Sequence, residues 1–333
     1  MKLRIRSIAL ILCLIFLLGA CSAGEDSDNN IPETENIVTD ADTADVSNIF
    51  SENNEESVSS PLLWKAFDAD GSVVLLFGSI HVGEADLYPL PAYIGDAFDS
   101  SEALAVEVNI KDIDLASSIE AMKLLLYSDG SKIYDHISEE LYNSAVDILN
   151  SLGVYLPLYD TYKPVMWMSL IDSILYEREG YHSDLGVDIN LMQTADILEK
   201  EIIEIESMET QYSILASFSE ELQEYLLQSS VDAYSSEDDT LELLVEAWKN
   251  GDEEELLKLL FTEDPTDISP ELIDEYNRAM STDRNILMAD FAERALAEDR
   301  ELFICVGEAH MLGEDGIVSL LINRGYTVDK VSD

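Results

Sequence analysis

The chain has 333 residues, of which 47% are hydrophobic, and its 69 acidic and 18 basic side chains give a formal charge of −51. This apolar content argues against disorder along the whole chain, because disordered chains lack the apolar residues that a core needs. The negative charge argues against nucleic acid as a partner, since phosphate is repelled and few Lys or Arg could release counterions. Three cysteines without a CxxC pair argue against a disulfide framework or a structural zinc site.

The first 20 residues have the order of a secretory signal. Three basic residues precede an apolar run of 11 residues (8–18), which is too short to span a membrane. The ending LGAC resembles the bacterial lipobox, in which the cysteine becomes the lipidated first residue. We therefore predict a lipoprotein signal peptide over 1–20, lipidation of Cys21 and a lipid-anchored protein on the extracytoplasmic face of the cell membrane. An ordinary signal with a chance cysteine is the alternative.

The segment after the signal is acidic and polar. Residues 22–60 carry 11 Asp and Glu and no Lys or Arg, so they cannot bury enough apolar area to offset their chain entropy. The composition predicts a disordered tether over 21–60 and a folded domain over 61–333. The domain itself keeps 58 acidic and 15 basic residues, so the negative charge belongs to it as well as to the tether.

Strand and helix patterns alternate from the start of the domain. LLWKAF, DADG and SVVLLFG predict a β-hairpin over 62–78. A short helix is predicted over 91–100, and the apolar run ALAVEV predicts a buried strand over 103–108.

Longer helical patterns fill the middle of the chain. Helices are predicted over 112–126, 138–150, 163–178, 185–200, most of 208–298 and 314–324, and further strands over 201–206, 301–307 and 326–331. Strands at both ends with helices between them predict an α/β fold that carries a large helical insertion.

Two of the predicted strands end in the same motif. VVLLFGSIHVGE contains Gly78 and His81, and LFICVGEAHMLGE contains Gly307 and His310. A buried strand of an α/β fold ends at the carboxyl edge of the sheet, where ligands bind, and glycine permits a sharp turn or a close approach there. Two such units side by side would bring two imidazoles together.

A single carboxylate interrupts the apolar strand ALAVEVN. Because an unpaired buried carboxylate is costly, Glu107 must pair with a base, bind a metal or lie at the exposed end of the strand. Together with His81 and His310 it forms a set suited to Zn²⁺, Mn²⁺ or Co²⁺ with open positions for water. Each histidine alone would more often be a hydrogen-bonded loop residue than a metal ligand. Cys305, in the run LFICV, is predicted to be an inert core residue.

These segments resemble the TraB/GumN family, which includes the pheromone-shutdown proteins and the Tiki metalloproteases, over about 61–333. The resemblance rests on GSIHVGEADLYPLP, AVEVN, YKPVMW, LGVDINLMQTA, IIEIESMETQ, RNILMADFAER and VGEAHMLGEDGIVSLLINRGYTV. The chain departs from the family pattern where Val165 and Met166 precede Trp167, and where Ile205 replaces the usual leucine.

The resemblance implies a fold like that of erythromycin-esterase and ChaN-like proteins and a metal-dependent peptidase activity on an unidentified peptide or protein. It implies that His81, Glu107 and His310 are the metal or catalytic set, with Mn, Co or Zn as the metal. A metal-bound water would be activated there, with Glu107 or Glu308 as the acceptor of its proton.

The resemblance also implies supporting roles for other residues. Arg284 and Asn285 would hold a substrate carboxylate or a polarised oxygen, and Glu206 would support the site or act as a base. Asp188 and Asn190 are expected to have structural roles at a turn and a helix start.

Two other functions remain open from the sequence. The same cleft could sequester a peptide pheromone or signal without cleaving it. Alternatively, the histidines could bind iron or haem, as in ChaN-like proteins.

Overall fold

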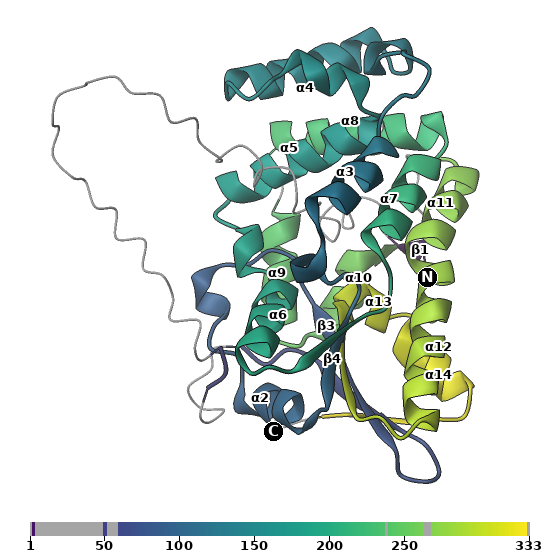
Figure 1. Cartoon of the computed structure of the whole chain (residues 1–333). Coiled ribbons are helices and arrows are strands. Elements are labelled where there is room, and N and C mark those ends of the chain that lie inside the picture. The colour runs from purple at the N-terminus through teal and green to yellow at the C-terminus, as the bar shows by residue number, and fades with distance from the viewer. Residues whose placement is uncertain (1, 4–48, 52–58, 237–238, 263–267, 332–333) are drawn as a thin grey trace, which may run out of the picture.

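The computed structural model describes residues 2–3, 49–51, 59–236, 239–262 and 268–331. Cys21, nearly all of the predicted signal peptide and most of the predicted tether lie outside these residues. Figure 1 shows a β-sheet in the lower half of the molecule and a block of stacked helices above it, with α4 farthest from the sheet. The mixed α/β class predicted from the sequence is confirmed, whereas the likeness to erythromycin-esterase and ChaN-like proteins stays a prediction.

The central sheet has six strands in the order β5-β4-β7-β3-β2-β8. Four neighbouring strands, β5, β4, β7 and β3, are parallel, while β2 is antiparallel to both β3 and β8. The strands are β2 (Leu63–Phe67), β3 (Val73–Ser79), β4 (Ala103–Val106), β5 (Glu201–Glu204), β7 (Leu302–Gly307) and β8 (Thr327–Lys330). A separate short pair joins β1 (Lys2–Leu3) to β6 (Phe261–Thr262).

The register of the central strands places the two Gly-x-x-His motifs next to each other. Gly78 lies opposite Val306, and Ser79 lies opposite Gly307, so β3 and β7 end at the same level. On the other side of β7, Val106 of β4 lies opposite Cys305. Strands β4 and β7 are buried along their whole length, as expected for apolar strands inside a parallel sheet. The two motifs therefore lie side by side, the arrangement in which their imidazoles can come together.

The helices follow the predicted pattern closely. They are α2 (Ala92–Ser100), α3 (Leu115–Lys123), α4 (Glu139–Ser151), α5 (Pro164–Arg178), α6 (Val187–Ile197), α7 (Met208–Ser217), α8 (Glu220–Ser235), α9 (Thr240–Lys249), α10 (Glu253–Leu260), α11 (Pro270–Asn277), α12 (Asp283–Ala297), α13 (Glu308–Met311) and α14 (Ile317–Asn323). Short 3₁₀ turns are η3 (Ala85–Leu87), η4 (Ile110–Asp112), η5 (Ile133–Asp135), η6 (Pro157–Thr161) and η7 (Ser183–Leu185), and η8 (Arg278–Thr282) is π-helical. Side-chain caps begin many of them, for example Ser207 at α7 and Ser219 at α8.

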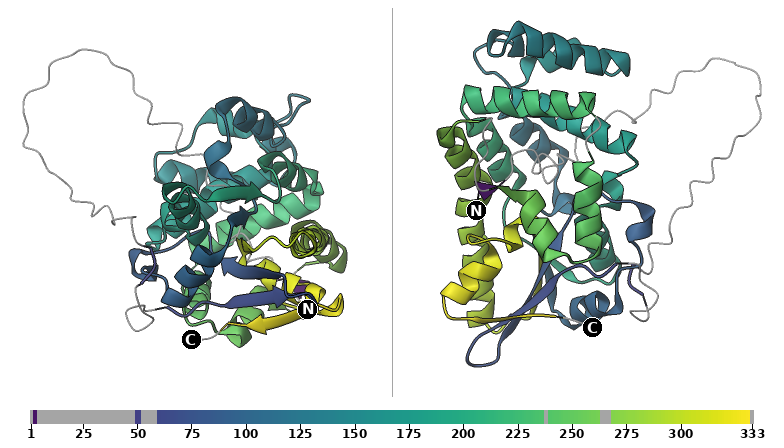
Figure 2. Two further views of the ribbon diagram at one scale, coloured as in Figure 1. Left: turned by 60° about the horizontal axis from the view of Figure 1, so that its bottom comes forward. Right: turned by 180° about the vertical axis from the view of Figure 1, so that it is seen from behind.

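The described residues form two apolar cores. The larger core surrounds the sheet, with α6 packed on β4 and β5, and α12 packed on β3 and α14. A smaller core around Trp167 joins α4, α5 and α8 in the helical block, which both views of Figure 2 place beyond one end of the sheet. No helix among the described residues is long and apolar enough to cross a membrane.

The structure differs from the sequence prediction mainly at the ends of elements. Strand β4 ends at Val106 and β5 at Glu204, and α14 begins only at Ile317. The short helix α13 was not predicted because four residues are too few to show helical periodicity. This helix carries His310, so the second motif turns directly from strand into helix.

Candidate functional site

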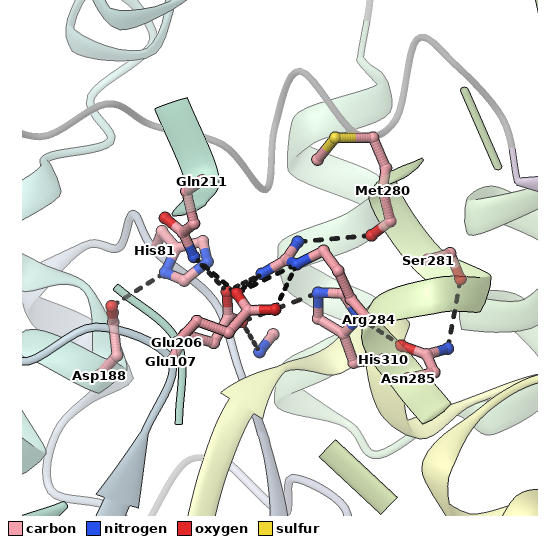
Figure 3. Close-up of polar contacts among 11 residues, drawn as sticks. His81, Glu107, Asp188, Glu206, Gln211, Met280, Ser281, Arg284, Asn285 and His310 are labelled. Carbon is pink, nitrogen blue, oxygen red and sulfur yellow. Dashed lines mark hydrogen bonds and ion pairs between the residues drawn. The ribbon is translucent and has the colours of Figure 1, made fainter. Parts of the chain in front are cut away.

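The candidate site lies where four parallel strands end. His81, Glu107 and Glu206 follow β3, β4 and β5, while His310 lies on α13, directly after β7. Backbone pairing continues past β4 and β5, because the N–H of Glu206 donates to the carbonyl of Glu107 at 2.8 Å. Helix α12 adds Arg284 to this group. Figure 3 shows that these side chains converge on one cluster.

Arg284 is the centre of the cluster. Its Nη2 lies 2.6 Å from Glu107 Oε2 and 2.7 Å from Glu206 Oε2, and its Nε donates to Glu206 Oε1 at 2.9 Å. The Gln211 amide on α7 donates to both carboxylates, at 3.1 and 3.2 Å. Glu107 Oε1 accepts the backbone N–H of Gly307 at 2.8 Å. Of the three possibilities that the sequence left for Glu107, the structure therefore shows pairing with a base.

This pairing determines the charge state of the cluster. Burial alone would raise the pKa of Glu107, but the nearby Arg284 charge outweighs it and holds the pKa well below its usual range. Burial likewise acts against the charge of Arg284, while the two carboxylates raise the pKa of the guanidinium. Glu107 is therefore ionised at any physiological pH, and as long as Arg284 contacts it, it is a weak proton acceptor.

His310 is buried and is held in one tautomer. Its Nδ1 lies 2.6 Å from Asn285 Oδ1. The Asn285 amide is oriented by its own donation to the Asp315 carbonyl at 2.8 Å, so its Oδ1 must accept and Nδ1 of His310 must carry the proton. The lone pair is then on Nε2, which lies 3.8 Å from Glu107 Oε1. Burial and the Arg284 charge lower the pKa of His310 to about 3, so this imidazole is neutral.

His81 is held by a carboxylate instead of an amide. Its Nδ1 lies 2.9 Å from Asp188 Oδ2, which makes Nδ1 the donor and directs Nε2 away from Asp188. Burial alone lowers the pKa of His81, but the charge and hydrogen bond of Asp188 outweigh burial and raise it to about 9.

The backbone fixes the distance between the His81 loop and the start of α6. Gly83 and His182 exchange two backbone hydrogen bonds, and the N–H of Val187 donates to the Ile80 carbonyl at 2.9 Å. A Cβ on Gly186 would lie 2.6 Å from the His81 carbonyl oxygen, so only glycine permits this approach.

The donor atoms of the site fit a divalent metal in part. Two imidazoles are held through Nδ1 and leave Nε2 as the second ring nitrogen, which is the usual arrangement of metal-binding histidines. Within the described parts of the chain, however, no three His, Cys, Asp or Glu side chains are grouped closely enough to hold a metal ion. The two histidines fit a metal, while Glu107, the expected third ligand, is engaged by Arg284 and Gly307.

Glu308 lies apart from this cluster. Both of its carboxylate oxygens are buried and have no hydrogen-bond partner among the described residues. The carboxylate lies over Gly78, where a Cβ would approach Oε2 to 1.7 Å, which explains the glycine of the first motif. Burial and the charge of Glu253 raise the pKa of Glu308 to about 8.

Two residues of the site were missed from the sequence. Asp188 was expected to have a structural role, but its carboxylate orients His81; Asn190 does have such a role, because it donates to the Gly186 carbonyl at 2.9 Å. Gln211, which bridges the two glutamates, stood in the segment IIEIESMETQ without being singled out.

Asn285 is fully buried, and its amide is hydrogen-bonded to protein groups. Cys305 is buried as predicted.

Comparison with known proteins gives the family of the chain. The TraB/PrgY/gumN family model matches residues 62–330. An uncharacterized protein of Escherichia coli (strain K12), YbaP, is 28% identical over 142 residues, which are 42% of this chain and 50% of YbaP. YbaP of Shigella flexneri matches to the same extent, so the chain spans about half the length of the curated relatives it matches. No solved structure matches. From the match over nearly the whole described domain, the chain belongs to the TraB/PrgY/GumN family.

Proposed function

We propose that the protein is a metal-dependent hydrolase that cleaves peptide bonds outside the cytoplasm, where a lipid on Cys21 anchors it to the membrane. The observation that carries the proposal is the pair of imidazoles at adjacent strand ends, each held through Nδ1 beside the ionised Glu107. The resemblance to the Tiki metalloproteases supports the peptide bond as the substrate, and the sequence LGAC supports the lipid anchor.

The residues of the site have separate tasks in this proposal. Asp188 and Asn285 orient His81 and His310, which would hold the metal through Nε2 with Glu107 as the third candidate ligand. A bound Mn²⁺, Co²⁺ or Zn²⁺ supplies a polarised carbonyl and an activated water.

Glu107 is also the favoured proton acceptor of the two that the sequence left open, because Glu308 lies outside the cluster. Arg284 lowers the basicity of Glu107 while they are in contact. A substrate oxygen that draws the guanidinium away would raise that basicity, since an opposite charge is what keeps the carboxylate ionised. Arg284 would then link substrate binding to activation of Glu107.

Metal analysis of the purified full-length protein tests the site. Elemental analysis is expected to find close to one divalent metal per chain, and substantially less in His81→Ala and His310→Ala. His182→Ala is the matched control, because His182 is exposed and its side chain lies outside the cluster. Unchanged metal content in both site variants would remove the two-histidine site.

Turnover separates the hydrolase from the other functions. We expect the protein to convert a mixture of short peptides into fragments detected by mass spectrometry, and to lose this activity in both histidine variants. Stoichiometric depletion of a peptide without fragments would instead favour a sequestering protein. A haem absorption band in the purified protein would favour the iron or haem binder.

A further inference from the structure

A cavity of about 510 Å³ lies among α3, the start of α5 and the turn between α7 and α8. We call it the α5 cavity. Its size falls in the range of small-molecule sites. Leu124, Leu126, Pro164 and Phe218 form apolar parts of its wall, and Lys163 and Gln223 add polar groups. Lys163 and Pro164 belong to the segment YKPVMW, for which the candidate site gives no role.

Lys163 supplies hydrogen-bond donors to the α5 cavity. Its ammonium donates to the Ala216 carbonyl at 2.9 Å, and no carboxylate among the described residues forms an ion pair with it. An ammonium has three N–H groups, so two remain for a ligand. Burial lowers the pKa of Lys163, with no acidic neighbour raising it. Lys163 is therefore a partly buried cation whose free N–H groups are not used by a carboxylate of the described residues.

Gln223 supplies an acceptor. Its side chain is only 5% exposed, and its Nε2 donates to the Phe218 carbonyl at 2.8 Å. Because a carbonyl can only accept, this bond identifies the donating atom as Nε2. The other amide atom is then Oε1, which can only accept. Oε1 is buried and has no partner among the described residues. An unsatisfied buried acceptor costs about 1–3 kcal/mol, which the N–H of a ligand would recover if the ligand displaced the wall enough to contact Oε1.

The charges at the wall favour a neutral ligand. The two acidic side chains are occupied, since Glu220 lies 2.8 Å from His136 Nδ1 and Asp129 accepts from Ser131 at 2.6 Å. They would still repel an anion, while Lys163 would repel a cation. A peptide amide fits this wall, because it has no net charge and can both accept from an ammonium and donate to an amide oxygen.

The α5 cavity is close to the candidate site along α7. Gln211 contacts Glu107 and Glu206 from this helix, and Ala216, which contacts Lys163, follows five residues later. Five residues of α-helix rise about 7.5 Å, which an extended peptide covers in about two residues. A peptide bound at the candidate site could therefore reach the cavity with a neighbouring residue.

We propose that the α5 cavity binds an uncharged residue of the peptide substrate, with Lys163 donating to a backbone carbonyl, Gln223 Oε1 accepting a backbone N–H, and an apolar side chain packing against Phe218. The biological meaning of this subsite rests on the proposed peptidase function. Its binding chemistry does not, so the two can fail separately.

Ligand-observed NMR with the full-length protein tests the subsite without turnover. The probe is N-acetyl-L-phenylalaninamide, and the comparison compound is N-acetyl-L-phenylalanine, which replaces the amide by a carboxylate. We expect saturable binding of the amide with a Kd on the order of 1 mM, as for a fragment that contributes about 4 kcal/mol. The carboxylate is expected to bind at least about fivefold more weakly, a difference near 1 kcal/mol.

Two tryptophan substitutions locate the binding. Ser128 and Ser151 are both exposed, but Ser128 lines the α5 cavity and Ser151 lines a separate cavity between α4 and α8. Ser128→Trp is expected to weaken amide binding at least about fivefold, and Ser151→Trp to leave it unchanged. Lys163→Met is expected to weaken binding similarly, with circular dichroism as the check on folding. Because Ser128 is exposed, its variant keeps the test decisive if Lys163→Met unfolds.

Three outcomes would overturn the inference. They are the absence of amide binding up to about 20 mM, equal or tighter binding of the carboxylate, and binding that Ser128→Trp leaves unchanged. Cleavage of peptides together with any of these would remove the subsite and keep the hydrolase. Cavity binding as expected, without cleavage of any peptide, would remove the hydrolase and keep the subsite.

Discussion

His81 and His310 are the last residues of two identical Gly-x-x-His motifs at the ends of two adjacent parallel strands, yet their surroundings differ in exposure and in charge. His81 is partly exposed and its Nδ1 meets a carboxylate, Asp188. His310 is buried, its Nδ1 meets an amide, Asn285, and the positive Arg284 lies nearby. The pKa of His81 is raised to about 9, whereas that of His310 is lowered to about 3.

One motif therefore supplies two imidazoles of different charge. The strand and the glycine determine where each histidine lies, while the residue at Nδ1 and the neighbouring charges determine whether it is protonated. These partners come from different helices, α6 for His81 and α12 for His310. In the metal-free protein, a rise in pH from 3 to 6.5 should therefore increase stability through His310. A further rise from 6.5 to 9 should decrease stability through His81.

The largest expected effect comes from removing the positive charge that Glu107 and Glu206 share. Arg284→Met leaves Glu107 and Glu206 buried without their cation, so we expect the free energy of unfolding to fall by about 3–5 kcal/mol. Urea unfolding followed by circular dichroism measures this loss.

Arg278→Met is the control for this substitution. Its guanidinium is exposed and lies 3.8 Å from Asp283, so the loss should stay below about 0.5 kcal/mol. An Arg284→Met protein as stable as the wild type would show that Arg284 does not hold the cluster together.

Next in size is the loss of the carboxylate from His81. With a pKa of about 9 in the folded protein against 6.5 as the ordinary value, His81 stabilises the protein fully below pH 6.5 and loses this contribution as pH rises through 9. The change amounts to about 3 kcal/mol. Asp188→Asn keeps an acceptor for Nδ1 but removes the charge, so it should flatten this pH dependence and lower the pKa of His81.

Urea unfolding at pH 6 and pH 9.5 and an NMR titration of the histidine ring, both with chelator present, measure these changes. Asp184→Asn, an exposed neighbour, is the control. A His81 pKa that stays near its wild-type value in Asp188→Asn would contradict the role of Asp188.

A third substitution makes the second histidine resemble the first. Asn285→Asp places a carboxylate at Nδ1 of His310, and we expect the pKa of His310 to rise from about 3 by about 1–3 units. The variant also loses the amide donation to the Asp315 carbonyl, which should cost about 1–3 kcal/mol of stability. The same NMR titration reads the pKa. If it falls or does not move, burial and Arg284 alone, and not the residue at Nδ1, determine the charge of His310.

The smallest effect is expected where the centre of the cluster has redundant contacts. Gln211→Met removes hydrogen bonds of 3.1 and 3.2 Å to Glu107 and Glu206. Arg284 still holds both carboxylates, so the free energy of unfolding should fall by only about 1 kcal/mol. Glu209→Gln, exposed on the same helix, is the control. A loss above about 3 kcal/mol would show that the amide contributes as much as the guanidinium.

Much of the fold and part of the site could be predicted from local patterns. Apolar runs predicted the strands that precede His81 and His310, and the matching motifs indicated that two neighbouring strands of this kind would bring the two imidazoles together. The single acidic residue in ALAVEVN predicted that Glu107 needs a partner. These predictions hold because strand burial and helix periodicity depend on residues close together in the chain.

The partners themselves could not be predicted in this way. Asp188 is 107 residues from His81, and Arg284 is 177 residues from Glu107. Many of the 69 acidic residues could have met His81, and nothing local distinguishes Asp188 among them. A family segment placed Arg284 near the site but did not reveal that two internal carboxylates occupy its guanidinium.

The sequence by itself therefore determined which chemical groups reach the carboxyl edge of the sheet, because strand patterns and glycines are local features. Only the tertiary structure decided the charge of those groups, because a pKa depends on burial and on charges within a few ångströms. In the tertiary structure Glu107 contacts a guanidinium, whereas the more deeply buried Glu308 has no hydrogen-bond partner among the described residues. The tertiary structure also gave one histidine a carboxylate and the other an amide.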